Sequence, residues 1–162
     1  MRVCTLNLNG IRSAANKGLF DWVQGLGFDC MGVQEVKAQH HDVVGRFERI
    51  GHLRGHFHYA QKKGYSGVGV YTRRKPSDVI VGLTHDEFDA EGRYVEARFD
   101  TLKRKFSVIS CYFPSGSSGE ERQAAKYRFL EVNTQPMFAA FDKVAEGRLC
   151  DAIIDHLAGQ RP

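Results

Sequence analysis

Apolar residues recur along this chain with two different spacings, and each spacing predicts its own kind of element. A mostly apolar run from Phe28 to Val33 is followed at once by an amide, a carboxylate and, soon after, a cation, which is typical of a buried strand whose end reaches the rim of a sheet. Between it and a short strand at residues 5–9, apolar residues repeat at helical spacing up to Gly27, where a helix would end. These helical positions are Leu19, Trp22, Val23 and Leu26. A right-handed crossover of this kind predicts two parallel strands.

The middle of the chain predicts antiparallel sheet. Residues 57–60 and 68–72 are expected to form two strands joined by a glycine-containing turn at residues 62–67. From Tyr94 to Asp100 the side chains alternate, so that apolar residues occupy one face and charged residues the other. The apolar face holds Val95, Ala97 and Phe99, and the charged face holds Glu96 and Arg98. A partner strand is expected from Phe106 to Phe113, and Pro114 ends it.

Further helices are predicted at four places. The first is a short helix suggested by Val43, Val44, Phe47 and Ile50. After a loop at residues 115–119, Ser118 and Glu121 are spaced as a capping box that would begin a second helix. A third would begin near Pro136 and run toward Gly147, and apolar residues at four-residue spacing predict a fourth from Arg148 to Ala158.

Composition fits one globular domain with a core, because 42% of the 162 residues are hydrophobic and 26% are charged. The first residues contain no basic and apolar leader, and no apolar run approaches the roughly 18 residues that a membrane span requires. We therefore expect a cytoplasmic protein with no membrane partner. The four cysteines, at positions 4, 30, 111 and 150, lack metal-binding spacing and are expected to be reduced thiols. A net charge of +4 permits a polyanionic partner without requiring one.

Two of the predicted strand ends carry candidate chemistry. Because parallel neighbours end at the same edge of a sheet, Asn7 and Glu35 should face one another. Glu35 is a candidate ligand for a hard cation, which prefers oxygen donors, and Asn7 could orient that ligand or a phosphate oxygen. The alternative is that Glu35 is only the solvated end of a strand. A zinc site is not expected at His52, His56 and His58, which have no nearby thiol or carboxylate.

Five segments together resemble bacterial exodeoxyribonuclease III. They are residues 6–12, 29–37, 63–68 and 91–94, and residues 112–114 with the Ser-Gly loop that follows, and they include Gln34-Glu35-Val36-Lys37 and Glu91-Gly92-Arg93-Tyr94. The resemblance implies an α/β (α+β) fold, namely a partial four-layer αββα sandwich of the DNase I-like type with mixed sheets. It also implies metal-dependent hydrolysis of duplex DNA from 3′ ends and beside abasic sites, in DNA repair.

The same resemblance implies roles for individual residues. Glu35 and Asn7 would be metal ligands for Mg²⁺, which Mn²⁺ could replace, and no small-molecule cofactor is implied. Tyr112 and Asn7 would be the catalytic residues, with the tyrosine at the scissile phosphate. The residues expected to contact double-stranded DNA are Lys37, Arg93, Ser115 and Gly116. Such contacts to phosphates position a duplex without reading its sequence.

The match ends near Glu131, and the family's later Gly-Asp-x-Asn and Ser-Asp-His motifs do not occur in this sequence. We therefore predict two regions, residues 1–131 as the N-terminal half of the family domain and residues 132–162 as a helical tail. A truncated sandwich is expected to expose sheet surface and to self-associate. Three functions stay open: a nuclease of this family with little activity in this chain, an inactive DNA-binding or partner-binding fragment, and a phosphodiesterase of lipid or inositol phosphates. No role is carried over to Asp151, Asp155 or His156.

Overall fold

A computed structural model of the chain describes residues 1–102 and 104–112, which belong to one compact unit, Met1–Tyr112. The elements in chain order are β1 (Val3–Asn7), α1 (Ile11–Asn16), α2 (Leu19–Leu26), β2 (Cys30–Gln34), α3 (His40–Val43), β3 (Arg49–Ile50), β4 (Leu53–His58), β5 (Val68–Thr72), β6 (Asp78–Val81), α4 (Asp86–Ala90), β7 (Tyr94–Asp100) and β8 (Lys105–Cys111). The helices predicted after Pro114, the boundary at residue 131, and the predicted DNA contacts Ser115 and Gly116 lie outside the described residues.

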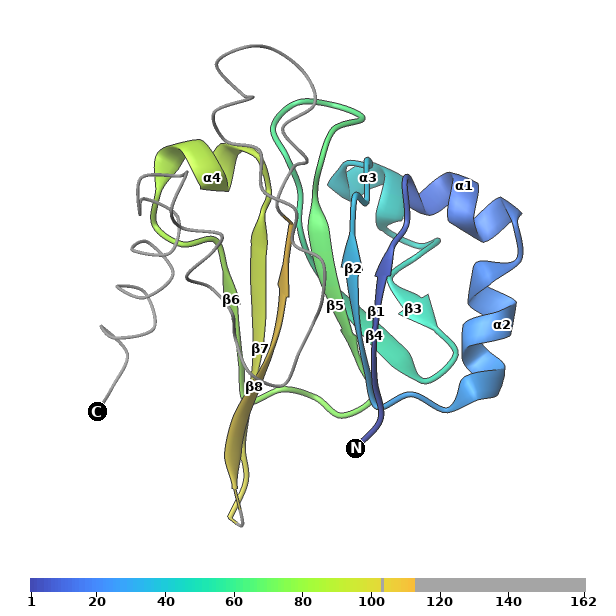
Figure 1. The fold of residues 1–162 in the computed structure, drawn as a ribbon, viewed down its shortest axis with the longest axis vertical. Coiled ribbons are helices and arrows are strands. Elements are labelled where there is room, and N and C mark those ends of the chain that lie inside the picture. Colours follow the sequence, from blue (N-terminus) through green and yellow to red (C-terminus); the bar gives the residue numbers. More distant parts are fainter. Residues whose placement is uncertain (103, 113–162) are drawn as a thin grey trace, which may run out of the picture. The chain divides into compact units, whose positions relative to one another are not determined.

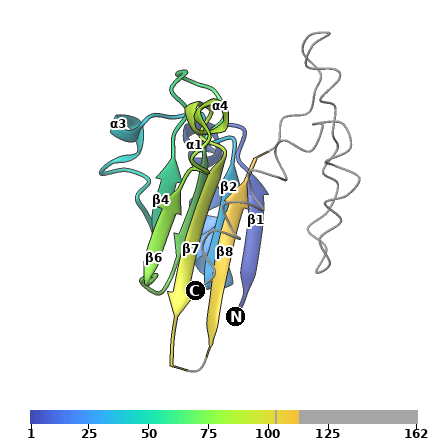
Figure 2. The ribbon, with the colours of Figure 1, turned by 90° about the vertical axis from the view of Figure 1, so that its left-hand side faces the viewer.

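The strands form two sheets that face each other (Figures 1 and 2). The five-stranded sheet has the order β1-β2-β5-β4-β3 and is mixed, because β1 and β2 are parallel whereas the other neighbours are antiparallel. The three-stranded sheet has the order β6-β7-β8 and is antiparallel throughout. The parallel pair and the antiparallel middle of the chain, both predicted from the sequence, are confirmed.

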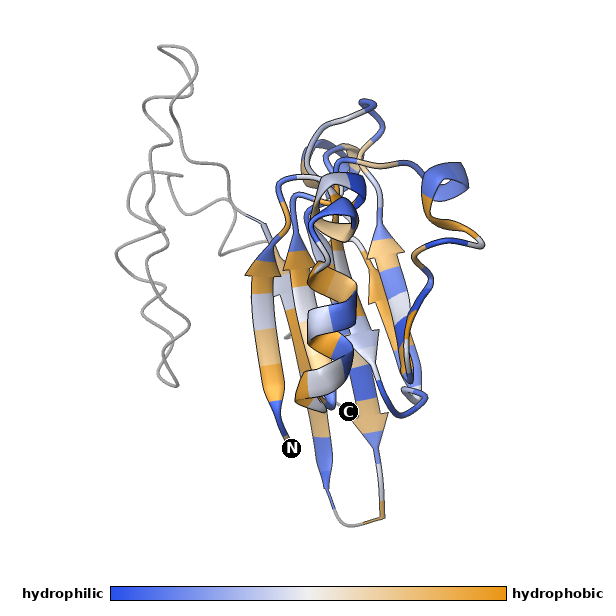
Figure 3. Cartoon of the chain, turned by 90° about the vertical axis from the view of Figure 1, so that its right-hand side faces the viewer, coloured by the Kyte–Doolittle hydropathy of each residue, from blue (hydrophilic) through white to orange (hydrophobic). Residues whose placement is uncertain are grey.

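Apolar side chains build one core on each face of the five-stranded sheet. On the outer face, where α1 and α2 lie in Figure 1, Val23 of α2 packs with Met31 and Val33 of β2. Between the sheets, Val68 and Val70 pack with the predicted apolar face of β7, formed by Val95, Ala97 and Phe99. The resulting apolar bands recur along the strands in Figure 3. Helices on one face and a second sheet on the other confirm the predicted α/β sandwich class.

Helix α2 agrees with its prediction, because it ends at Leu26 and Gly27 follows with a left-handed φ of 65°. The helix predicted from Val43 to Ile50 is wrong. Helix α3 ends at Val43, since Val44 is extended, with ψ of 132°, and Gly45 is left-handed, with φ of 71°. Ile50 lies in β3 instead and is buried there. The pairing of Arg49 and Ile50 with β4 outweighed the local helical spacing.

The strand predicted at residues 57–60 is displaced, because β4 begins at Leu53 and ends at His58. Gly55 lies inside β4, where a Cβ atom would come within 2.5 Å of the Phe57 ring. This glycine therefore serves close packing within a strand. β8, at Lys105–Cys111, begins one residue before the predicted Phe106 and ends before Tyr112, while the predicted last residue, Phe113, lies outside the described residues. The short elements α1, α4 and β6 were not predicted at all.

Two strands lie at the edge of their sheets on the same side of the unit, β1 and β8. Val3 of β1 is 50% exposed and Ile109 of β8 is 41% exposed. The self-association predicted for exposed sheet surface stays a prediction. Within residues 1–102 and 104–112, no helix has the length and apolar character needed to cross a membrane.

Candidate functional site

Three strand ends bring polar side chains together at one end of the unit. β1 ends with Asn7, β2 is followed by Glu35, and β8 is followed by Tyr112. Asn7 donates a hydrogen bond of 2.8 Å from Nδ2 to Oε1 of Glu35, which confirms that these two residues face one another. The Tyr112 hydroxyl donates a second hydrogen bond, of 2.9 Å, to the same oxygen. The juxtaposition therefore joins both sheets at a single carboxylate.

Lys37 completes the surroundings of this carboxylate, since its Nζ lies 2.7 Å from Glu35 Oε2. Burial acts to raise the pKa of the Glu35 carboxyl, but hydrogen bonds from Asn7, Lys37 and Tyr112 together lower that pKa below its ordinary value. Glu35 is therefore an anion at neutral pH, with both oxygens aimed by fixed donors. This is more than the solvated strand end that the alternative interpretation required.

The backbone around the carboxylate is held in an unusual conformation. Asn9, Glu35, Lys37 and Ser66 all have positive φ, between 43° and 50°, and none of them is a glycine. Such residues cost roughly 1–3 kcal/mol each and persist only where neighbours impose them. Here Gly10 N donates to Glu35 O at 2.8 Å and Lys37 N donates to Ser66 O at 2.9 Å, so two flanking loops clamp the segment. Strain of this kind is concentrated at functional sites.

Lys37 is held on its other side by Asn9, whose Oδ1 accepts a hydrogen bond of 2.5 Å from Nζ. The lysine side chain is 33% exposed, so its charge is accessible from solvent while it is paired with Glu35. The backbone N–H of Asn9 in turn donates to Asn7 Oδ1 at 3.0 Å. Asn7 therefore has both ends of its amide engaged, one of them with Glu35, and the metal-ligand and catalytic roles predicted for Asn7 stay predictions.

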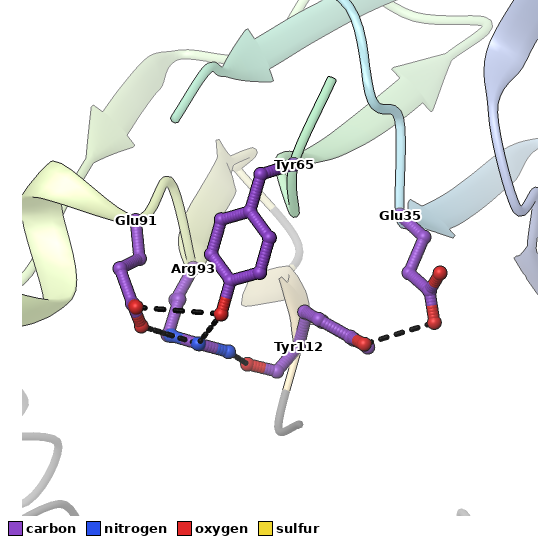
Figure 4. A network of polar contacts seen from close by, with 5 residues as sticks. All are labelled: Glu35, Tyr65, Glu91, Arg93 and Tyr112. Atoms are coloured by element: carbon purple, nitrogen blue, oxygen red, sulfur yellow. Dashed lines mark hydrogen bonds and ion pairs between the residues drawn. The ribbon is translucent and has the colours of Figure 1, made fainter. Parts of the chain in front are cut away.

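Arg93 is buried, with only 5% of it exposed, and lies between Glu91 and Tyr112 (Figure 4). Its guanidinium forms an ion pair with Glu91, donates at 3.0 Å to the backbone oxygen of Tyr112 and donates at 3.3 Å to the Tyr65 hydroxyl. The guanidinium carbon also lies 5.5 Å from the centre of the Tyr112 ring. These contacts fix the tyrosine whose hydroxyl reaches Glu35.

Gly92 makes this placement of Arg93 feasible. Its φ is 63°, and a Cβ atom there would lie 2.6 Å from the backbone nitrogen of Ala60 and 2.6 Å from the carbonyl carbon of Tyr59. Only glycine satisfies both the left-handed conformation and the close approach of two backbone segments. The segment Glu91-Gly92-Arg93 can therefore lie directly against the end of β4.

The sequence motifs included Tyr65 and Glu91, but no role was assigned to either. Both are partners of Arg93, which donates to the Tyr65 hydroxyl and pairs with Glu91. The Tyr65 hydroxyl in turn donates at 3.4 Å to Glu91 Oε1. The motif at residues 91–94 could have indicated the pairing of Glu91 with Arg93, because a carboxylate two positions before an arginine can pair with it across a glycine turn. The DNA contact predicted for Arg93 stays a prediction, and its burial and pairing favour a positioning role instead.

The Tyr112 hydroxyl is a permanent hydrogen-bond donor at physiological pH. Burial, followed by the hydrogen bond and charge of Glu35, raises the pKa of Tyr112 well above the ordinary tyrosine value. The phenol therefore stays protonated and can donate to an anionic oxygen. In the described structure that oxygen belongs to Glu35.

The donor set at the strand ends fits a hard dication that keeps most of its own water. Mg²⁺ needs only one or two protein carboxylates, and it shares its remaining positions with water and substrate phosphate. Glu35 supplies one ionised carboxylate on a clamped segment, and its Oε2 has Lys37 as its partner. Across the described part of the chain, no three His, Cys, Asp or Glu side chains gather into a metal-binding cluster.

Two hollows in the surface differ in character. One of about 480 Å³ adjoins the site and is lined by Lys37 together with Gly10, Arg12, Ser13, Asn16, Lys17 and Gly64. The other, of about 310 Å³, lies at the opposite ends of the strands, where apolar residues such as Phe99 and Phe106 line it together with Asp29, Arg74 and Arg104. The first holds three cations, Arg12, Lys17 and Lys37, and it adjoins Glu35 through the ion pair of Lys37, so it is the hollow beside the candidate site.

Comparison with known proteins identifies one family. Residues 4–140 match the Endonuclease/Exonuclease/phosphatase family. The chain is 32% identical over 123 residues to an exodeoxyribonuclease of Bacillus subtilis, covering 75% of this chain and 46% of that protein. It is 32% identical over 146 residues to exodeoxyribonuclease III of Haemophilus influenzae, covering 88% of this chain and 53% of that protein.

Solved structures give the same fold. The catalytic domain of Xenopus laevis APE2 superposes with a TM-score of 0.65 at 21% identity, covering 94% of this chain and 54% of that one. AP endonuclease LMAP from Leishmania major superposes with a TM-score of 0.59 at 21% identity, covering 74% of this chain and 42% of that one. The chain thus spans about half the length of these relatives, and the likeness to their structures concerns the fold alone.

Proposed function

The chain belongs to the Endonuclease/Exonuclease/phosphatase family, and we propose that its site is that of a DNA-repair nuclease, which hydrolyses phosphodiester bonds of duplex DNA at 3′ ends and abasic sites. The observation that carries the proposal is the ionised Glu35 carboxylate, oriented by Asn7, Lys37 and Tyr112 at the meeting point of both sheets. Its relatives from Bacillus subtilis and Haemophilus influenzae are named exodeoxyribonucleases, which supports this reaction class.

Glu35 would hold Mg²⁺, with Mn²⁺ as a substitute, and the metal when bound would polarise phosphoryl oxygens and stabilise the charge on the leaving oxygen. Asn7 keeps the Glu35 carboxylate in one orientation, since its Nδ2 donates to Oε1 at 2.8 Å. A carboxylate held in one orientation loses little freedom when it binds a metal. The proposed site is therefore preorganised by the protein's own hydrogen bonds.

Tyr112 supplies a neutral donor to the substrate. Its hydroxyl is protonated at physiological pH and sits on a strand end that Arg93 fixes through the Tyr112 carbonyl. A hydrogen bond transferred from Glu35 to a non-bridging phosphate oxygen would stabilise negative charge as it develops there. This donor role needs the ring to be rigid, which the ion pair between buried Arg93 and partly exposed Glu91 supports.

DNA would lie along the cationic hollow beside the site. Lys37 at its edge, with Arg12 and Lys17 in its lining, can neutralise backbone phosphates without contacting bases. Arg12 is paired with Asp42 at 3.2 Å and Lys37 with Glu35 at 2.7 Å, but both side chains stay partly exposed, so all three cations are candidates. The proposed recognition is sequence-independent and weakens as the salt concentration rises.

Binding without efficient turnover is a second candidate function for the 162-residue chain. Hydrolysis requires a group that positions the attacking water as well as a metal and a phosphate donor. Near the carboxylate of Glu35, the described residues offer no second carboxylate or histidine as its partner. Removing members of a catalytic unit usually leaves a small residual rate. We expect this chain to bind duplex DNA and to cleave it slowly.

The test follows one labelled duplex that carries an abasic site and a recessed 3′ end. Binding is measured by fluorescence anisotropy in Mg²⁺, and cleavage and nucleotide release are measured on the same duplex with wild type and with Glu35→Ala. Salt-dependent binding with slow, Glu35-dependent cleavage is expected. Rapid Glu35-dependent turnover would confirm the nuclease and refute slow cleavage, whereas failure to bind either duplex DNA or Mg²⁺ would overturn the proposed function.

A further inference from the structure

A polar network crosses the space between the two sheets just before the candidate site. Nε2 of Gln34 donates to Oγ of Ser110 and to Oγ1 of Thr5, at 3.1 Å in each case. The Ser110 hydroxyl donates onward to the backbone oxygen of Val33, also at 3.1 Å. One amide thus connects β1, β2 and β8, although β8 belongs to the other sheet.

The position of the network along the strands is what makes it informative. Each of its three members precedes a residue of the candidate site by one or two positions in the sequence. Thr5 precedes Asn7, Gln34 precedes Glu35, and Ser110 precedes Tyr112. Because side chains alternate along a strand, Thr5 and Asn7 point to one face of β1. Ser110 lies two positions before Tyr112, which directly follows β8.

At Gln34 and Ser110 the packing between the sheets changes from apolar contacts to hydrogen bonds. Further from the site, the facing residues are apolar, with Cys30 of β2 and Val108 of β8 in one buried cluster. At Gly32 the sheets approach closely, since a Cβ atom there would lie 3.4 Å from Ser110 Oγ. Apolar contacts between sheets are non-directional and tolerate sliding, whereas hydrogen bonds of fixed geometry do not.

Ser110 is 1% exposed, so its hydroxyl cannot exchange these partners for bulk water. A buried polar group that lost its partners would be strongly unfavourable, which restricts how β8 can shift against β2. The same restriction applies to Tyr112, which is carried by β8. The separation of the Tyr112 hydroxyl from Glu35 therefore depends on contacts that neither residue makes.

We propose that Gln34 and Ser110 are positioning residues, which fix the register between the sheets and so hold Tyr112 in hydrogen-bonding contact with Glu35. Their effect on catalysis rests on the proposed function, but their effect on geometry does not. Neither residue touches the substrate in this proposal. Thr5 contributes at the exposed edge of the network and should matter less, because water can replace its hydroxyl.

The experiment compares Ser110→Ala and Gln34→Met with Ser107→Ala. Ser107 is a matched control on the same strand, because its hydroxyl donates at 2.6 Å to Glu96, on the opposite face of β8. The first readout is the ¹³Cζ resonance of Tyr112 in tyrosine-labelled protein, assigned with Tyr112→Phe. We expect both test variants to shift this resonance toward that of a water-exposed tyrosine, Ser107→Ala to leave it unchanged, and Ser110→Thr, which keeps the hydroxyl, to restore it.

The second readout is cleavage of an abasic-site duplex. For Ser110→Ala and Gln34→Met, kcat should fall on the order of tenfold while KM stays within about twofold of the wild-type value. The reason is that a small misplacement of a catalytic group mainly slows the chemical step. If the wild type shows no cleavage, the proposed function fails but the resonance still decides the positioning role. Test variants that are less stable than the wild type, yet keep the wild-type Tyr112 resonance, would show that the network is merely structural and would overturn the proposal.

Discussion

The hydroxyl of Tyr112 donates a 2.9 Å hydrogen bond to Oε1 of Glu35, although the two residues lie 77 positions apart and in different sheets. This contact joins the end of β8 to the end of β2 and is made where both sheets expose polar groups. It couples the charge of the carboxylate to the protonation of the phenol. The consequences of that coupling can be measured without any substrate.

Substituting Tyr112 with phenylalanine should raise the pKa of Glu35. The hydrogen bond from Tyr112 is one of three that lower this pKa, and phenylalanine removes it while keeping the ring that packs on Arg93. The pKa is measured by ¹³C NMR of labelled glutamate side chains, assigned with Glu35→Gln. Tyr59→Phe is the control, because Tyr59 lies in a separate aromatic cluster with Phe57. Equal Glu35 pKa values in wild type and Tyr112→Phe would contradict the structure.

Replacing Glu35 should remove the binding of Mg²⁺ and Mn²⁺. Loss of a residue that only hydrogen-bonds to a metal ligand already weakens metal affinity by about 10- to 100-fold. Loss of the carboxylate ligand itself should therefore weaken metal binding by at least about tenfold. Calorimetry with Mg²⁺ or water relaxation with Mn²⁺ measures this for Glu35→Ala. Glu87→Gln, which removes an exposed carboxylate on α4, is the matched control. Unchanged binding by Glu35→Ala would refute its role as ligand.

Lys37→Ala should weaken binding of duplex DNA and reduce its dependence on salt. A single phosphate contact contributes about one unit to the slope of log K against log salt, so the slope should become shallower by about that amount. The control is Lys75→Ala, because Lys75 is exposed between β5 and β6, at the other ends of the strands. The prediction fails if both variants change the slope equally.

Arg93 should contribute more to stability than to DNA affinity. Arg93→Met would leave Glu91 without its buried partner and the Tyr112 carbonyl without a donor, at a cost of about 2–4 kcal/mol in the free energy of unfolding. Arg12→Met breaks an exposed ion pair with Asp42 and should cost less than about 1 kcal/mol. Urea denaturation measures both. A normal stability with a large loss of DNA binding would instead support the direct phosphate contact first predicted for Arg93.

Glu35 should make stability depend on pH in the acid range. Its pKa is lowered on folding, so its contribution is fully present above the ordinary glutamate value of 4.5 and is lost as the pH falls through the lower folded value. The difference in unfolding free energy between wild type and Glu35→Gln should therefore shrink on acidification. Denaturation series between about pH 3 and pH 6 cover the transition. A difference that stays constant across that range would mean that the pKa is not lowered in the folded state.

Local pattern was sufficient for the elements with long, regular periodicity. The apolar run of β2, the helical spacing that ends at Gly27 and the alternation of β7 each follow from a period that neighbouring residues repeat. Local pattern was insufficient where a single glycine changed the length or type of an element. Gly45 ended α3 and Gly55 allowed β4 to extend through it, and neither effect follows from spacing.

The sequence by itself determined that Asn7 and Glu35 meet, because a crossover between two parallel strands brings their ends to one edge. Its motifs also pointed to the family to which the chain belongs. Only the tertiary structure decided that Tyr112 reaches the same carboxylate, that Arg93 is buried with Glu91, and that Gln34 joins the two sheets. Those contacts depend on how one sheet lies on the other, a relation set by packing across many residues and absent from any local period in the chain.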